Sequence, residues 1–129
     1  MKESTQQKMP LEGRVIVYLE PDEMTRTLVS RMLTKRGAKV IAVGEHEAAY
    51  KACKVKSPHA IVAGQGLDGQ QAKEFITNIQ SYIIPGTPLV AYADEKSDLA
   101  GYCASLITVP SGKGFGVLAQ SLETVWHKC

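Results

Sequence analysis

The chain has 129 residues, 44% of them hydrophobic, with a formal net charge of +2 and 3 cysteines. This length supports one domain with one core, and the near balance of 15 basic and 13 acidic side chains argues against the concentrated basic surface that direct nucleic-acid binding requires. No apolar run approaches the roughly 20 residues of a membrane-spanning helix, and cysteines without C-x-x-C spacing favour free thiols in a reducing cytoplasm over a metal site.

The first twelve residues are polar and lack the apolar segment of a signal peptide. They predict a flexible N-terminal lead over residues 1–12, followed by a single domain over 13–129. Five nearly continuous apolar runs then follow, which is typical of strands in a parallel sheet covered on both faces. These runs are Arg14–Leu19, Lys39–Val43, Ala60–Ala63, Pro88–Ala93 and Leu106–Val109.

Helical patterns separate the apolar runs. The first helix should begin after Asp22 and stop at Gly37. Its expected core-facing residues are Thr25, Leu28, Val29, Met32 and Leu33. Further helices are expected over Glu45–Val55, Gln70–Gln80 and Gly116–Lys128. Asp68 and Gln71 have the spacing of a capping box, whereas Asp94–Ala104 contains a glycine and has room for only a short helix.

This alternation predicts a flavodoxin-like (βα)5 fold, which is a doubly wound, five-stranded parallel sheet, here with a shortened fourth helix. In such sheets, ligands bind at the carboxyl ends of the strands, near the point where strand order reverses. The residues that directly follow the strands are therefore the candidates for a functional site.

Several strings of the sequence resemble the receiver domain of bacterial two-component response regulators, over about residues 13–127. They are VIVYLEPDEMTRTLVSRMLTKRGAKV, SPHAIVAGQGLDG, TPLVAYAD and LITVP. The resemblance implies a CheY-like domain in a cytoplasmic signalling pathway. It also implies a phosphorylation site, formed by two acids that hold Mg²⁺, an accepting Asp, a hydroxyl residue and a Lys, with an aromatic switch residue nearby.

At these chemical positions, only Glu20 keeps the acidic character that the family requires. The two acids, the accepting Asp, the hydroxyl residue, the Lys and the aromatic switch fall, in that order, on Glu20 and Pro21, Gly64, Ala93, Val109 and Leu106. Glycine offers no nucleophile, and alanine and valine offer neither a hydroxyl group nor a charge. The sequence therefore predicts a degenerate pseudo-receiver that is independent of phosphorylation, is not an enzyme, and has no catalytic residue, metal or cofactor.

Two glycine-rich turns leave a second interpretation open. Gly64-x-Gly66-x-x-Gly69 follows a strand and precedes a helix, as dinucleotide-binding loops do. The turn Gly112–Gly116 stands at the start of the last helix, where an anion can bind. Together they would suit a small-ligand or nucleotide sensor. Otherwise, the first turn needs its glycines to adopt positive φ in a shortened loop.

The expected partners are proteins, either as a second copy of the chain or as an output domain attached to this N-terminal input domain of a larger regulator. Tyr102, Leu106 and Trp126 are the candidate partner-binding residues, although for Leu106 we favour a role in filling the space of the missing aromatic switch. The densest group of basic residues is the lysines within Lys51–Lys56, which is typical of a solvated helix end.

Overall fold

The computed structural model describes residues 11–93, 106–110 and 116–127. Within these ranges, five strands form one parallel sheet in the order β2-β1-β3-β4-β5. The strands are β1 (Val15–Leu19), β2 (Lys39–Val43), β3 (Ala60–Ala63), β4 (Leu89–Ala93) and β5 (Leu106–Pro110). Their bounds agree with the apolar runs to within one residue, and strand order reverses between β1 and β3.

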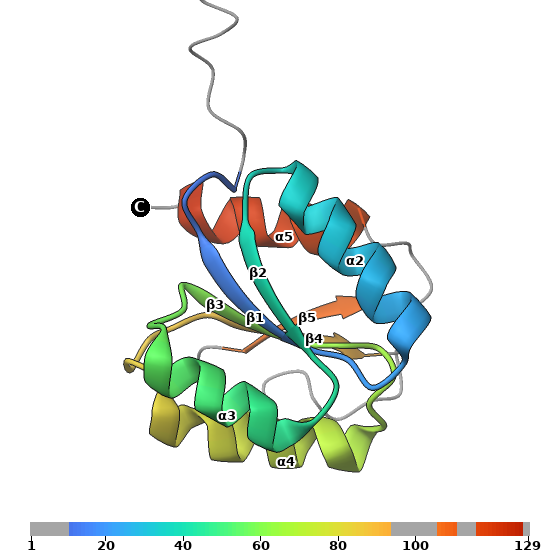
Figure 1. The fold of residues 1–129 in the computed structure, drawn as a ribbon, viewed down its shortest axis with the longest axis vertical. Coiled ribbons are helices and arrows are strands. Elements are labelled where there is room, and N and C mark those ends of the chain that lie inside the picture. The colour runs from blue at the N-terminus through green and yellow to red at the C-terminus, as the bar shows by residue number, and fades with distance from the viewer. Residues whose placement is uncertain (1–10, 94–105, 111–115, 128–129) are drawn as a thin grey trace, which may run out of the picture.

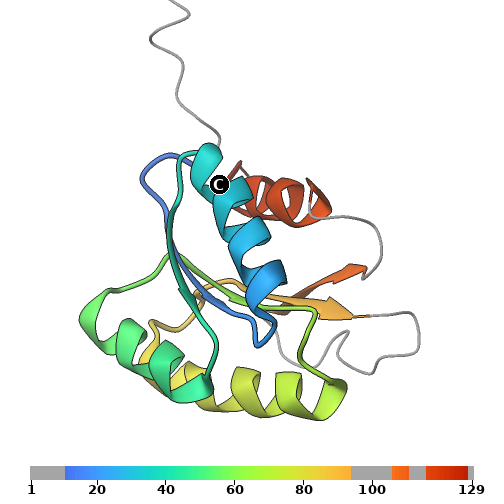
Figure 2. The same ribbon diagram turned by 45° about the vertical axis from the view of Figure 1, so that its right-hand side comes forward.

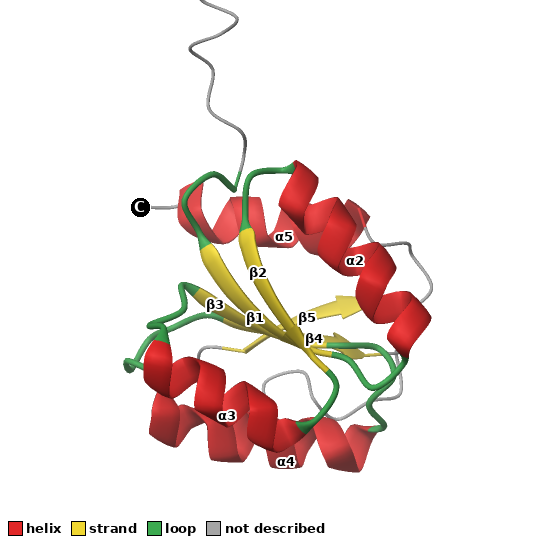
Figure 3. Cartoon of the chain, in the orientation of Figure 1, coloured by secondary structure: helices red, strands yellow, loops and turns green. Residues whose placement is uncertain are grey.

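The helices form two layers around this sheet. They are α2 (Glu23–Lys35), α3 (His46–Val55), α4 (Gly69–Ile79) and α5 (Gly116–His127), with a 3-10 turn, η1 (Gln80–Tyr82), after α4. Helices α2 and α5 cover one face, while α3 and α4 cover the other (Figures 1 and 2). The helices, strands and loops of this three-layer arrangement are distinguished in Figure 3. The predicted doubly wound (βα) architecture is therefore confirmed.

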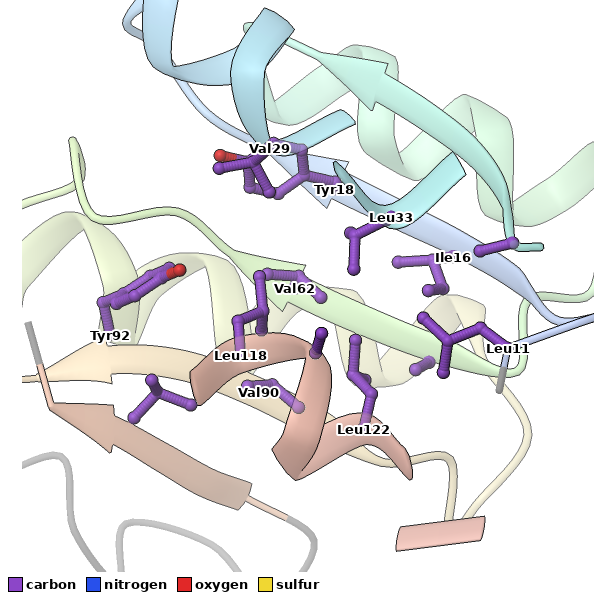
Figure 4. Packing of buried hydrophobic residues seen from close by; sticks show 14 residues of the cluster. Leu11, Ile16, Tyr18, Val29, Leu33, Val62, Val90, Tyr92, Leu118 and Leu122 are labelled. Carbon is purple, nitrogen blue, oxygen red and sulfur yellow. The ribbon is translucent and has the colours of Figure 1, made fainter. Parts of the chain in front are cut away.

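The core consists of two hydrophobic clusters, one on each face of the sheet. Strand β1 is buried on both faces: Ile16 and Tyr18 join the cluster under α2 and α5, and Val17 and Leu19 join the cluster under α3 and α4. Figure 4 shows the first cluster, in which Tyr18 and other strand side chains meet those of α2 and α5. Alternate residues of a strand point to opposite faces, so an uninterrupted apolar run serves both clusters.

Helix α2 is oriented by its cap and by a narrow buried stripe. The Asp22 carboxylate accepts hydrogen bonds from the backbone N–H and the hydroxyl of Thr25, at 2.9 and 2.6 Å. Val29 and Leu33 are buried, but Leu28, which we expected in the core, is 50% exposed. That prediction was wrong because neighbouring helical residues lie about 100° apart, and the sheet-facing positions are taken by Val29 and Leu33.

The N-terminal boundary of the domain also differs from expectation. Leu11, which we placed in the flexible lead, is fully buried within the cluster under α2 and α5. Its backbone N–H donates to the carbonyl oxygen of Arg36 at 2.8 Å. Because most residues near Leu11 are polar, the sequence pattern did not reveal that this one apolar side chain is buried. Residues 1–10 of the expected lead and the expected short helix over 94–104 lie outside the described residues. No helix in the described part of the chain is long and apolar enough to cross a membrane.

Candidate functional site

The carboxyl ends of β1 and β3 hold a buried carboxylate. Glu20 is fully buried, and among the described residues it is the one buried charged side chain. Its Oε2 accepts a hydrogen bond from the backbone N–H of Asp22 at 3.1 Å, and its Oε1 accepts from the N–H of Gly66 at 3.3 Å and from the Tyr18 hydroxyl at 3.4 Å. Because a buried carboxylate is costly unless it is hydrogen-bonded, these donors explain how Glu20 is tolerated there.

Two glycines make room for the Glu20 side chain. A Cβ atom on Gly64 would meet Glu20 Oε1 and would lie 2.8 Å from the Leu19 carbonyl oxygen and 2.9 Å from Glu20 Cδ. A Cβ atom on Gly66 would meet Glu20 Oε2 and lie 3.2 Å from Cδ. The Glu20 carboxylate therefore fills the space into which any side chain at Gly64 would project.

This result corrects our explanation of the glycine-rich loop. We expected its glycines to supply positive φ, but the described glycines with positive φ are Gly13, Gly37 and Gly86. Gly64 and Gly66 are instead required for the close approach of Glu20. Sequence reasoning missed this contact, although a strand-end acid opposite two glycines, at the point where strand order reverses, was the available signal.

Two tyrosines, Tyr18 and Tyr92, lie on the face covered by α2 and α5 (Figure 4) and are affected by the buried Glu20 carboxylate. Burial raises the pKa of Tyr18 far above its usual value, and the neighbouring Glu20 charge raises it further. Burial, followed by the charge of Glu20, raises the pKa of Tyr92 to about 12. Both hydroxyls therefore stay neutral at physiological pH, and sequence reasoning identified neither of them.

Arg26 binds the backbone beside the carboxylate. Its Nη1 donates to the carbonyl oxygen of Glu20 at 2.8 Å. Gly44 leaves room for this guanidinium, since a Cβ atom there would lie 2.6 Å from Arg26 Nη1. At the same rim, the hydrogen bonds from Thr25 lower the pKa of the Asp22 carboxyl. Asp22 is therefore ionised and committed to capping α2.

These residues do not fit the Mg²⁺ ion that the receiver resemblance implies. Such a site needs several oxygen ligands around one cation, but both oxygens of Glu20 already accept hydrogen bonds from within the chain. Pro21 has no ligand atom, and Gly64 supplies no carboxylate. Across the described ranges, no three His, Cys, Asp or Glu side chains are grouped so that they could hold a metal ion.

The other predicted positions are distributed over the same sheet. Val109 is fully buried in the cluster under α2 and α5. Ala93 ends β4 and pairs with Pro110. Leu106 is partly buried against the cluster under α3 and α4, which agrees with a space-filling role. Tyr102 and the side chain of Trp126 lie outside the described residues, so their assignment to a partner surface stays a prediction.

The loop after β3 is poorly suited to hold a phosphate. The N–H of Gly64 donates to the Leu19 carbonyl oxygen at 2.7 Å, and the N–H of Leu67 donates to the Gly64 carbonyl oxygen at 3.2 Å. The N–H of Gly66 donates to Glu20. These three N–H donors are thus engaged within the chain, next to the Glu20 carboxylate. The second glycine-rich turn, over 112–115, lies outside the described residues.

Comparisons with known proteins identify the fold. No family model matches the sequence, and no curated protein matches it. Solved structures do match. They include chemotaxis protein CheY4 of Vibrio cholerae, at 16% identity, a TM-score of 0.72, and coverage of 87% of this chain and 98% of that one.

Two further solved structures are as similar in fold to this chain as CheY4 is. Response regulator TrrA of Thermotoga maritima, solved in complex with Mg²⁺–BeF, shares 16% identity at a TM-score of 0.71, covering 87% of this chain and 98% of its own. The regulatory domain of the repressor of iron transport regulator, RitR, in its inactive form, shares 15% identity at a TM-score of 0.72, covering 91% and 98%. The chain therefore has the CheY-like, flavodoxin-like fold of response-regulator receiver domains.

Proposed function

We propose that this chain is a non-phosphorylatable, receiver-like signalling module that acts through protein–protein contacts. The receiver fold suggests a place in two-component signalling. The chemical positions suggest that this copy of the fold works without phosphoryl transfer and without an enzymatic activity of its own.

One observation carries this proposal: the Glu20 carboxylate occupies the space beside Gly64. In a receiver of the resembled family, the side chain of the accepting Asp would project from this position. Gly64 has no nucleophile, and restoring one by substitution would drive a side chain into Glu20. Val109, at the position of the family's Lys, has no charge with which to stabilise a transferred phosphoryl group.

Intact-mass spectrometry with acetyl phosphate and Mg²⁺ tests this proposal. We expect no mass increase over several hours, whereas a phosphorylatable CheY-like protein treated in parallel should gain about 80 Da, one phosphoryl group. Mg²⁺ with fluoroberyllate, the combination held by TrrA, should leave the thermal midpoint unchanged. A phosphorylated species, or a shift with fluoroberyllate, would refute a non-phosphorylatable module.

The partner is expected to be another protein, either a second copy of the chain or an output domain joined to it. Sedimentation across a hundredfold range of concentration distinguishes self-association from a monomer. The small-ligand alternative is weakened by the engaged N–H groups around Gly64. Thermal-shift measurements with nucleotides and cyclic dinucleotides should therefore show a flat response.

A further inference from the structure

The opposite edge of the sheet, at the amino ends of β3 and β4, contains a pocket of about 590 Å³. Its lining comes from the end of α3, the segment leading into β3, and the segment from η1 towards β4. The lining residues used below are Lys54, Pro58, Tyr82, Ile83, Ile84 and Pro85. This pocket is far along the strands from Glu20 and shares no residue with the carboxylate site.

The pocket has an aromatic wall that packing holds in place. Tyr50 stacks on Tyr82, with ring centroids 4.9 Å apart and an interplanar angle of 10°, and on Phe75 at 6.1 Å and 21°. The Lys54 ammonium lies 5.4 Å from the centre of the Tyr82 ring, within the range of a cation–π contact. A wall fixed in this way loses little freedom on binding, which favours recognition.

Apolar side chains are exposed around the same pocket. Ile84 is 65% exposed, and Val55, which follows Lys54 at the end of α3, is 78% exposed. A second, smaller hollow of about 150 Å³ shares Ile83, Ile84 and Pro85 with the first. The Ile84–Pro85 segment therefore forms a ridge between two hollows, which is a shape that can receive apolar side chains on either side.

The charged residue of the pocket lining is basic. It is Lys54, and no Asp or Glu is among the described residues that line the pocket. Lys56 adds a second positive charge two positions further along the chain. The whole chain, in contrast, has 15 basic and 13 acidic residues. An occupant with carboxylates would complement this surface, and one with lysines or arginines would be repelled.

We propose that the surface formed by Lys54, Val55, Lys56, Tyr82, Ile84 and Pro85, here called the amino-edge surface, binds an acidic peptide segment of a partner protein. A large apolar side chain of that segment would enter the pocket beside Tyr82 and Ile84, and its carboxylates would face the lysines. This inference deepens the proposed function and rests on its protein-interaction part. It does not depend on the state of the phosphorylation site.

Peptide display followed by direct titration tests this assignment. A random-peptide library is selected on the intact chain, and enriched peptides are synthesised with a fluorophore and titrated by anisotropy. We expect Asp and Glu next to a large apolar residue in the enriched peptides. Ile84→Asp should weaken their binding by at least about 30-fold, as loss of a buried anchor does. The double variant Lys54→Glu and Lys56→Glu should weaken it by about tenfold, with a smaller effect at high salt.

Matched controls come from α2. Met24→Asp alters an apolar residue that is 73% exposed, and Lys35→Glu reverses a charge in the last turn of that helix. Both should leave peptide affinity within about twofold of the unmodified chain, because surface changes away from a contact have small effects. Equal urea midpoints for all variants would show that each of them folds.

Three results would overturn the amino-edge surface. They are enrichment without acidic residues, binding that survives both Ile84→Asp and the double lysine variant, and binding to phosphatidylserine vesicles that the same variants abolish. The last would identify a membrane as the occupant. Peptides that bind elsewhere would remove this surface but leave the proposed function intact, whereas phosphoryl uptake from acetyl phosphate would refute the proposed function without moving the peptide site.

Discussion

The carboxyl edge and the amino edge of the sheet differ in how much space around them is open to other molecules. At the carboxyl edge, the Glu20 carboxylate, its backbone donors and two glycines fill the space in which a receiver would do chemistry. At the amino edge, a hollow of about 590 Å³ stays open beside Tyr82. The comparison shows that the space at the carboxyl edge is filled from within the chain, whereas open space lies at the amino edge.

The largest expected effect comes from adding one carbon atom at the closed edge. Gly64→Ala should lower the free energy of unfolding by about 3 kcal/mol, the upper range for overpacking, since the new Cβ would meet Glu20 and the Leu19 carbonyl. Urea denaturation measures the loss. Gly69→Ala is the matched control, because a Cβ there has no atom within 4 Å. Equal stability of the two variants would show that the edge is not closed.

A somewhat smaller loss should follow removal of the carboxylate itself. Glu20→Leu leaves the N–H groups of Asp22 and Gly66 without their acceptor, so we expect a loss of about 2 kcal/mol. Glu20→Gln keeps the shape and an amide oxygen, and should lose less than half of that. If Glu20→Leu were as stable as the unmodified chain in urea, the carboxylate would not be a structural part of this edge.

Alkaline pH should lower the free energy of unfolding, because Tyr92 near the carboxyl edge then loses its proton. Burial and the Glu20 charge raise its pKa from the usual value of 10.0 to about 12 in the folded protein, so folding favours the neutral hydroxyl. That stability is complete below pH 10 and is lost as pH rises towards 12, by about 1.4 kcal/mol at pH 11. Urea midpoints between pH 8 and 11 should fall less steeply for Tyr92→Phe. Identical slopes would contradict this assignment.

The smallest effect on stability is expected at the amino edge, for a substitution that adds one carbon atom, as Gly64→Ala does at the carboxyl edge. Ser81 is exposed and lines the pocket, so Ser81→Thr should change the free energy of unfolding by less than about 0.5 kcal/mol. Urea denaturation beside Gly64→Ala gives the contrast directly. A loss above about 1 kcal/mol would mean that the amino edge is packed as tightly as the carboxyl edge.

Patterns among residues that are close in sequence were enough to predict most of the fold. The continuous apolar runs located all five strands, since a parallel sheet covered on both faces has no polar side to interrupt them. Asp68 and Gln71 form the predicted capping box at the start of α4, and Asp22 caps α2. Each of these features depends on residues that are close in sequence, which is why they could be predicted.

Contacts between distant segments were beyond those rules. The receiver resemblance placed the accepting position at Gly64, but it did not reveal that Glu20, 44 positions away in the chain, occupies the space beside Gly64. Likewise, the stacking of Tyr50 on Tyr82 joins the middle of α3 to η1. Leu11, which we placed in the flexible lead, is buried, and Leu28, which we expected to be buried, is exposed. Burial depends on which positions the sheet and its helices cover, and the hydrophobicity of a residue alone does not reveal that.

The burial of Leu11 has a geometrical consequence. The described chain enters at Leu11, beside the turn before β2, and α5 runs back antiparallel to the strands, so both ends of the domain lie at the amino edge (Figure 1). Any polypeptide joined before Leu11 or after His127 would start from that edge. A tether of this kind raises the effective concentration of the joined segment, so even a weak acidic motif on a covalent neighbour would dock there before a free competitor.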